Sequence, residues 1–160
     1  MKKQMSVYGS GPLYVSIIVG ITLIVLYLEH TGVINRFVIS GLETELKIIG
    51  RIIMLASGLM WIKSAFKSKL QESVKENKLV TTGVYAYVRN SIYTAITFFI
   101  GGILIFNGNM YLLLLMPVYW AIMTVLMKYT EEKWLRELYG QEYEDYCEKV
   151  NRCIPWFKRK

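Results

Sequence analysis

The chain has 160 residues, enough for one domain, with an apolar fraction of 54% and a positive mean hydropathy of +0.33. Soluble domains usually contain ~45–50% apolar residues, and here the excess is gathered in blocks, which excludes an ordinary soluble globular protein. The formal net charge of +7 suits anionic lipid headgroups, and no segment resembles a nucleic-acid-binding module, so no nucleic-acid partner is expected.

The first predicted element is a membrane-spanning helix over residues 8–28. A helix rises ~1.5 Å per residue and the hydrocarbon layer is ~30 Å thick, so one span needs roughly 17–25 residues. The segment ends in Tyr27-Leu28-Glu29-His30 without a small-residue cleavage site, and we therefore expect an anchor instead of a signal peptide. Residues 31–46 form an external connection, for which an interfacial loop and a short re-entrant segment both remain open.

Three further apolar segments predict helices over residues 48–66, 91–110 and 111–127, because backbone groups in lipid must bond internally. The 91–110 segment reaches spanning length only when its flanking polar residues are included. Asn107-Gly108-Asn109 is a turn that is too short for anything but a helical hairpin. The sequence therefore predicts an all-α polytopic membrane protein with about four transmembrane helices, forming a single domain over residues 1–160.

The basic residues are distributed unevenly between the two sides of these segments. Of the 19 Lys and Arg residues, all but Arg36, Lys47 and Arg51 fall on one side. Basic loops stay in the cytoplasm, so both termini, the loop 67–90 and the tail 128–160 are predicted to be cytoplasmic. The tail alternates apolar and charged positions at helical spacing, which indicates amphipathic helices on the membrane surface. Any chemistry is expected in these two long segments, which are rich in Tyr and ionisable groups.

Two cytoplasmic segments carry distinctive motifs. Residues 79–93 read Leu-Val-Thr-Thr-Gly-Val-Tyr-Ala-Tyr-Val-Arg-Asn-Ser-Ile-Tyr. Residues 131–155 begin with paired Glu, continue with Tyr-Gly-Gln-Glu-Tyr-Glu-Asp-Tyr and end in Ile-Pro. In this order, with an apolar hairpin between them, they resemble the signatures of the isoprenylcysteine carboxyl methyltransferase and phospholipid methyltransferase superfamily. The resemblance covers about residues 46–158.

The resemblance implies an integral-membrane methyltransferase that binds S-adenosylmethionine on the cytoplasmic side and takes a lipophilic or lipid-modified substrate from the bilayer. On matching positions, Leu79, Val80 and Tyr85 would line the adenosine and methionine portions of the cofactor. Tyr93 would approach the methionine end, and Glu131 would hold the ribose. An ionised carboxylate can accept both ribose hydroxyls, which makes the last assignment physically reasonable.

The start of the helix that begins near residue 91 is a candidate anion site. Its free N–H groups, from Ser91, Ile92 and Tyr93, suit the methionine carboxylate. The family's Arg-His-Pro is Arg89-Asn90-Ser91 here. Asn90 has two open interpretations: a helix N-cap, for which Asn is favoured, or a hydrogen bond from its amide to the cofactor carboxylate. Unlike His, an amide cannot become cationic or act as a general base.

The candidate catalytic residues are Asn90, Glu132 and Arg152. A carboxylate acceptor needs a cation to orient it, either Lys128 or Arg152, whereas an amine acceptor must lose a proton, for which Glu132 is the nearest base. Glu132 can also pair with Arg136 at i, i+4, and Arg152 can contact a lipid headgroup. Two other functions stay open, which are a sterol-reductase-like NADPH-dependent oxidoreductase and a non-catalytic membrane adaptor. Cys147 and Cys153 lack partner His residues, so no metal site is predicted.

Overall fold

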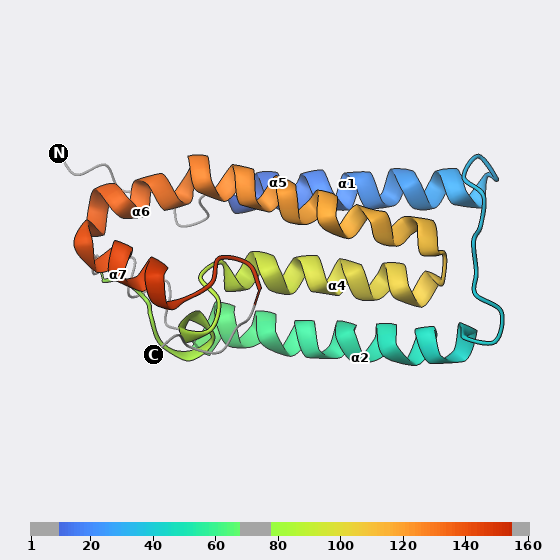
Figure 1. Ribbon diagram of the computed structural model, residues 1–160, viewed down its shortest axis with the longest axis horizontal. Coiled ribbons are helices and arrows are strands. Elements are labelled where there is room, and N and C mark those ends of the chain that lie inside the picture. The colour runs from blue at the N-terminus through green and yellow to red at the C-terminus, as the bar shows by residue number, and fades with distance from the viewer. Residues whose placement is uncertain (1–9, 68–77, 155–160) are drawn as a thin grey trace.

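The computed structural model describes residues 10–67 and 78–154, and regular structure within them is entirely helical (Figure 1). Four long helices lie side by side with alternating direction: α1 (Gly11–His30), α2 (Glu43–Ile62), α4 (Ser91–Asn107) and α5 (Leu115–Tyr129). Shorter elements are the π-helical continuation of α2, η1 (Lys63–Lys67), the 3-10 helices η2 (Gly83–Ala86) and η3 (Met110–Leu114), and the terminal helices α6 (Glu131–Tyr139) and α7 (Gln141–Lys149). The predicted all-α class is confirmed.

Three helical runs of the described residues are long and apolar enough to cross a membrane: Gly11–His30, Glu43–Ala65 and Met110–Tyr139. Helix α4 is apolar but has 17 residues, which correspond to a length of about 25 Å. The count of four spans therefore stays a prediction. Helix α2 begins at Glu43, earlier than the predicted residue 48, because two glutamates in its first turn suit the positive end of the helix dipole.

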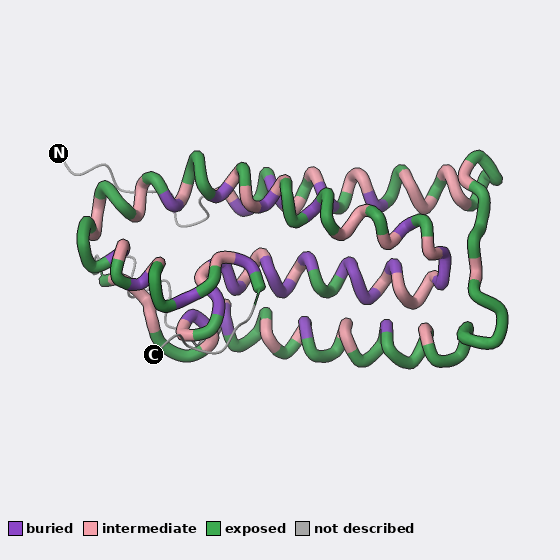
Figure 2. Tube along the Cα trace, in the orientation of Figure 1, coloured by how far each residue is buried: buried purple, intermediate pink, exposed green. Residues whose placement is uncertain are grey.

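Helix α4 is the centre of the bundle and holds more buried residues than any other helix, as Figure 2 shows. Its contact with α2 is unusually close. A Cβ atom on Gly102 would lie 2.9 Å from the carbonyl oxygen of Gly50, and one on Gly50 would lie 2.7 Å from the carbonyl oxygen of Gly102. The two backbones touch because neither position has a side chain. The outward face of α2 is apolar and exposed, as expected of a surface in contact with lipid.

Buried hydroxyl groups tie α1 to the two helices beside it. The phenol of Tyr14 lies 2.6 Å from the hydroxyl of Thr97 on α4, and the hydroxyl of Thr22 lies 2.8 Å from the phenol of Tyr119 on α5. Such pairs satisfy polar groups that could not reach water inside the bundle. Helix α1 is therefore fixed in register against the core.

Residues 31–42 connect α1 to α2 in an irregular loop that contains no helix, and residues 43–46 of the predicted connection belong to α2. The interfacial and re-entrant alternatives for this connection both stay predictions. Asn109 holds the loop in place, since its side-chain oxygen accepts from the backbone N–H of Phe37 at 3.1 Å and its amide donates to Glu29 at 3.2 Å. Gly108 ends α4 with φ +83°, a conformation that favours glycine. The predicted turn between the last two long helices is confirmed.

The opposite end of the bundle contains α6, α7 and the segment 78–90 (Figure 1). Parts of the predicted elements lie outside the described residues: positions 8–9 of the first span, 68–77 of the loop and 155–160 of the tail. The cytoplasmic orientation of this end stays a prediction from the basic residues. The two motifs of the sequence both fall at this end.

Candidate functional site

The two motif segments pair with each other although they are about sixty residues apart. The N–H of Arg89 donates to the carbonyl of Asn151 at 2.9 Å, and the N–H of Asn90 donates to the carbonyl of Arg152 at 3.1 Å. The phenol of Tyr146 donates to the carbonyl of Tyr85 at 2.6 Å. The segment 78–93 and the segment 131–154 therefore form one continuous structure at the end of the bundle.

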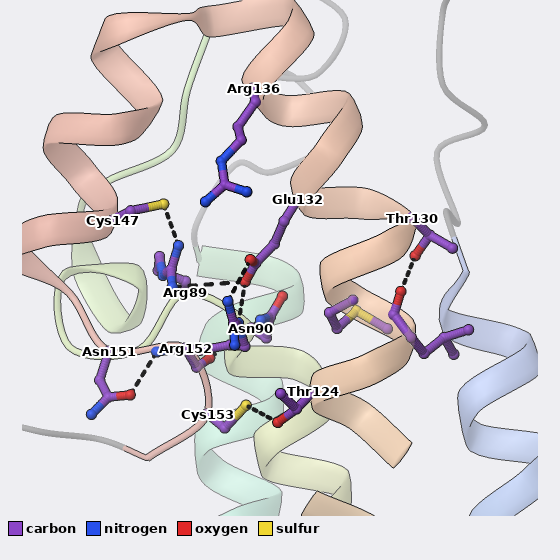
Figure 3. Close-up of polar contacts among 12 residues, drawn as sticks. Arg89, Asn90, Thr124, Thr130, Glu132, Arg136, Cys147, Asn151, Arg152 and Cys153 are labelled. Carbon is purple, nitrogen blue, oxygen red and sulfur yellow. Dashed lines mark hydrogen bonds and ion pairs between the residues drawn. The ribbon is translucent and has the colours of Figure 1, made fainter. Parts of the chain in front are cut away.

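Glu132 is the buried centre of this structure, with 1% of its side chain exposed (Figure 3). Arg152 binds it through two bonds, from Nε to Oε1 at 2.6 Å and from Nη2 to Oε2 at 2.9 Å. The Nη2 atom of Arg89 lies 3.7 Å from Oε1. Planar guanidinium groups match a carboxylate in this bidentate way, which also explains why the hydrogen bonds raise the pKa of Arg152.

Of the alternatives for Glu132, the pair with Arg136 is not formed among the described residues. Arg136 instead donates from Nε to Glu144 on α7 at 2.7 Å, and the two side chains are 42% and 46% exposed. The i, i+4 spacing places two residues on one helix face. Glu132 nevertheless points inward and binds the guanidinium groups of Arg152 and Arg89, which belong to neighbouring segments. The Arg136 pair serves to join α6 to α7.

Arg89 is buried and incompletely satisfied. Its Nη1 donates to the Cys147 thiol, and its Nε has no hydrogen-bond partner among the described residues. Burial raises the pKa of that thiol, so the thiol stays neutral and adds no negative charge. The cluster of Arg89, Glu132 and Arg152 thus holds two positive charges against one negative charge. A further anion would be stabilised here, because buried charges require partners.

Asn90 occupies the N-cap position of α4, and its carbonyl accepts from the N–H of Thr94 at 2.9 Å. Its side chain, however, makes no capping hydrogen bond. The amide Nδ2 donates to the carbonyl of Arg152 at 3.3 Å instead. The capping interpretation is therefore right for the backbone and wrong for the side chain, because the amide is turned toward the C-terminal segment. Ser91 follows and is fully buried, and its Oγ has no hydrogen-bond partner within the described parts of the chain.

Glu131 faces away from this cluster, toward α1 and α4. Its Oε1 accepts from the phenol of Tyr93 at 2.7 Å and from the backbone N–H and hydroxyl of Ser10 at 2.9 and 3.0 Å. The structure thus brings together two predicted cofactor residues, Tyr93 and Glu131. Sequence reasoning missed Ser10, which lies 121 positions from Glu131 and belongs to neither motif.

The remaining predicted residues differ in how deeply they are buried. Leu79 is half-buried and packs against the cluster of Tyr143, Tyr146 and Val150, whereas Val80 and Ile92 are half-buried elsewhere in the segment. Tyr85 is buried, and this raises its pKa, so its phenol stays protonated. Lys128 is exposed at the last turn of α5 and is not part of the cluster of Arg89, Glu132 and Arg152.

Comparison with known proteins gives one family and a few relatives. The family model described as phospholipid methyltransferase matches residues 46–142. The protein-S-isoprenylcysteine O-methyltransferase of Schizosaccharomyces pombe is 37% identical over 82 residues, covering 51% of this chain and 34% of that protein. A probable protein-S-isoprenylcysteine O-methyltransferase of Oryza sativa subsp. indica is 31% identical over 91 residues, which cover 52% of this chain and 44% of that protein. The matches thus span less than half of these relatives. No solved structure matches the chain.

Proposed function

The chain belongs to the phospholipid methyltransferase family, and from this premise we propose that it is an integral-membrane methyltransferase that uses S-adenosylmethionine and modifies a lipophilic acceptor. The observation that carries the proposal is the convergence of the two motif segments. Arg89 and Asn90 hydrogen-bond to Asn151 and Arg152, while Tyr93 hydrogen-bonds to Glu131. Residues that the family resemblance assigns to one site therefore lie at one end of one bundle.

The residues present fit the cofactor's polar groups. The methionine carboxylate needs donors, and the first turn of a helix such as α4 leaves N–H groups without an intrahelical acceptor. They lie next to the buried Oγ of Ser91, which has no partner among residues 10–67 and 78–154. The ribose needs an acceptor, and Glu131 is the half-buried carboxylate nearest to Tyr93. Both requirements are met within the same few residues.

The chain's own residues would bind the cofactor and align its methyl group with the acceptor. The cofactor, when bound, supplies an electrophilic methyl group on a sulphonium centre. Glu131 would accept the ribose hydroxyls, and Leu79, Val80 and Tyr85 would provide apolar walls that exclude water. The amide of Asn90 would donate to the cofactor carboxylate. Methyl transfer is an in-line displacement at the methyl carbon, and no proton is transferred at that carbon. Most of the rate enhancement would therefore come from alignment of the acceptor with the methyl group.

The charge of the buried cluster favours an acceptor carboxylate. Arg152 and Arg89 together exceed the charge of Glu132, so an anionic acceptor would complete the neutralisation. Both oxygens of Glu132 already accept from Arg152, which leaves this carboxylate poorly suited to remove a proton from an amine. The relatives named above as O-methyltransferases agree with an oxygen acceptor. An amine headgroup, which the family's description suggests, is the alternative.

The test is methyl transfer by the purified protein in lipid nanodiscs. Methyl-labelled S-adenosylmethionine is supplied with either a prenylated cysteine or phosphatidylethanolamine, and Glu131→Gln serves as the impaired control. We expect label on the prenylated cysteine as a base-labile ester. Label on phosphatidylethanolamine would favour the amine alternative. Absence of transfer together with absence of S-adenosylhomocysteine binding would contradict the proposed function.

A further inference from the structure

Three donors converge on a single oxygen of Glu131. The phenol of Tyr93 and both donors of Ser10 bind Oε1, at distances between 2.7 and 3.0 Å. Among the described residues, no hydrogen bond involves Oε2 of the same carboxylate. The carboxylate is therefore held by one oxygen, and its other oxygen is available to a ligand.

The Ser10 hydroxyl has a single proton, and it donates this proton in a hydrogen bond to the Glu131 carboxylate. Its Oγ also lies 3.0 Å from the hydroxyl of Thr130 and 4.0 Å from Sδ of Met127, so three acceptors compete for it. Thr130 has a proton of its own and donates it to the carbonyl of Leu126 at 2.6 Å. Charged acceptors form the stronger hydrogen bonds, so the Ser10 proton goes to Glu131.

The start of α1 is rigidly attached beside this contact. A Cβ atom on Gly11 would lie 2.7 Å from Cε1 of Tyr93, so the helix touches the ring directly. Tyr14 packs edge-on against the same ring, with a centroid separation of 6.0 Å. Ser10 and α1 lie outside the segment 46–142 that the family model matches. This part of the site is therefore one that the family match does not contain.

We propose that Ser10 is a positioning residue for Glu131 and that the start of α1 forms a wall of the cofactor site. By holding Oε1, Ser10 turns Oε2 toward the ribose hydroxyls and reduces the freedom that the carboxylate loses on binding. The inference rests on the proposed function, in which Glu131 holds the ribose. Ser10 itself touches no reacting atom and acts only through the carboxylate.

The test is calorimetry of the full chain in detergent with S-adenosylhomocysteine. Ser10→Ala should bind about 3–10-fold more weakly, since one hydrogen bond to a charged group is lost while the backbone N–H remains. Ser10→Thr keeps the hydroxyl and should stay within about twofold of wild type. Ser16→Ala, the same change at an exposed position of α1, is the matched control and should leave the affinity unchanged.

A second ligand separates positioning from general loosening of the fold. The 2′,3′-dideoxyribose analogue of S-adenosylhomocysteine lacks both hydroxyls that Oε2 would accept, so its affinity should hardly change in Ser10→Ala. A merely structural role would weaken both ligands equally and would overturn the inference, as would wild-type affinity of Ser10→Ala for the parent ligand. If wild type and Ser10→Ala both fail to bind either ligand, the proposed function itself fails. If wild type binds and only the Ser10 effect is absent, the proposed function stands.

Discussion

Two adjacent carboxylates at the start of α6 show how differently neighbouring residues are used. Glu132 is enclosed by guanidinium groups from the segment 78–90 and the C-terminal segment, whereas Glu131 accepts from α1 and α4. Successive helix positions point about 100° apart, so one residue faces the buried cluster and the next faces the start of the bundle. The pair in the sequence is thus one stabilising residue and one candidate ligand-binding residue.

The first prediction concerns Glu132. Among the described residues, Glu132 is the carboxylate that pairs with the guanidinium groups of Arg89 and Arg152. Glu132→Gln removes it, and we expect a loss of about 3 kcal/mol in the free energy of unfolding. The loss falls at the low end for such pairs because the Arg152 side chain is 25% exposed. Thermal unfolding in detergent measures it, with Glu137→Gln on the exposed face of α6 as the control. Equal melting temperatures for the two variants would contradict the buried ion cluster.

The second prediction concerns Asn90, where the amide donates to the carbonyl of Arg152. Asn90→Asp places a carboxylate against that carbonyl, so the free energy of unfolding should fall by about 1–2 kcal/mol. The new carboxylate also faces the cofactor's own carboxylate, so this variant should bind S-adenosylhomocysteine more weakly than wild type and Asn90→His. Asn90→His keeps a donor and restores the family residue. A chain that has adapted to Asn gains no affinity from it, whereas a large gain would mark a degenerate relative. Melting temperatures and calorimetry decide, and an Asp variant that behaves like wild type would refute the site role of Asn90.

At the residue scale the sequence predicted the candidates but not their partners. The motifs pointed to Glu131, Glu132, Asn90 and Arg152, and all four lie at the same end of the bundle. The alternative in which Glu132 pairs with Arg136 was wrong, because a helix-spacing argument ignores residues that come from other segments. Ser10 was missed because it fell inside the predicted span over residues 8–28, where nothing in the sequence indicates a contact 121 positions away.

At the scale of elements, the close contact of α2 with α4 decides how the bundle packs. Gly50 and Gly102 meet backbone to backbone, and a side chain on either would collide with main-chain atoms that cannot rotate away. Main-chain obstacles are costlier than flexible side chains, because the helices themselves must separate. The start of α4, which carries Asn90 and Ser91, depends on this placement.

The third prediction follows from that contact. Gly50→Ala and Gly102→Ala should each destabilise the protein by about 1–3 kcal/mol, through separation of the two helices. Gly58→Ala, on α2 with open space around it, should be neutral or slightly stabilising because Ala favours helix. Thermal unfolding in detergent compares the three. Neutral Gly50 and Gly102 variants would show that the helices lie further apart.

The elements themselves were largely predictable. Runs of apolar residues fixed the positions of α1, α2, α4 and α5 within a few residues, and Gly108 marked the turn between the last two. The neighbours of each helix were not predictable, because apolar runs that face lipid and apolar runs that face protein look alike. The shortness of α4 leaves the number of spans open to experiment.

At the scale of the whole molecule, the two ends of the bundle have different character. One end holds the candidate site and most of the described basic residues. The other end holds the Asn109 contacts and the loop 31–42 (Figure 1). Basic residues near spans stay in the cytoplasm, so the site should face the cytoplasm and the Asn109 end should face outward.

The fourth prediction tests this orientation. In a chain whose native cysteines are replaced by serine, Asn35→Cys should react with a membrane-impermeant label applied from outside intact cells, because this position is exposed in the outer loop. Glu137→Cys, exposed on α6, should react only after the membrane is permeabilised. Labelling of both positions from the same side would rule out the alternating arrangement of the long helices in a membrane.

The central claim is that the two paired motif segments form an S-adenosylmethionine site, and calorimetry with S-adenosylhomocysteine tests it most directly. The wild-type chain should bind the ligand with one site per chain. Glu131→Gln should weaken binding by about tenfold or more, because an amide matches two ribose hydroxyls only in part, while Glu137→Gln on the same helix stays at wild-type affinity. No heat of binding in the wild-type protein, or equal affinities in wild type and Glu131→Gln, would contradict the account.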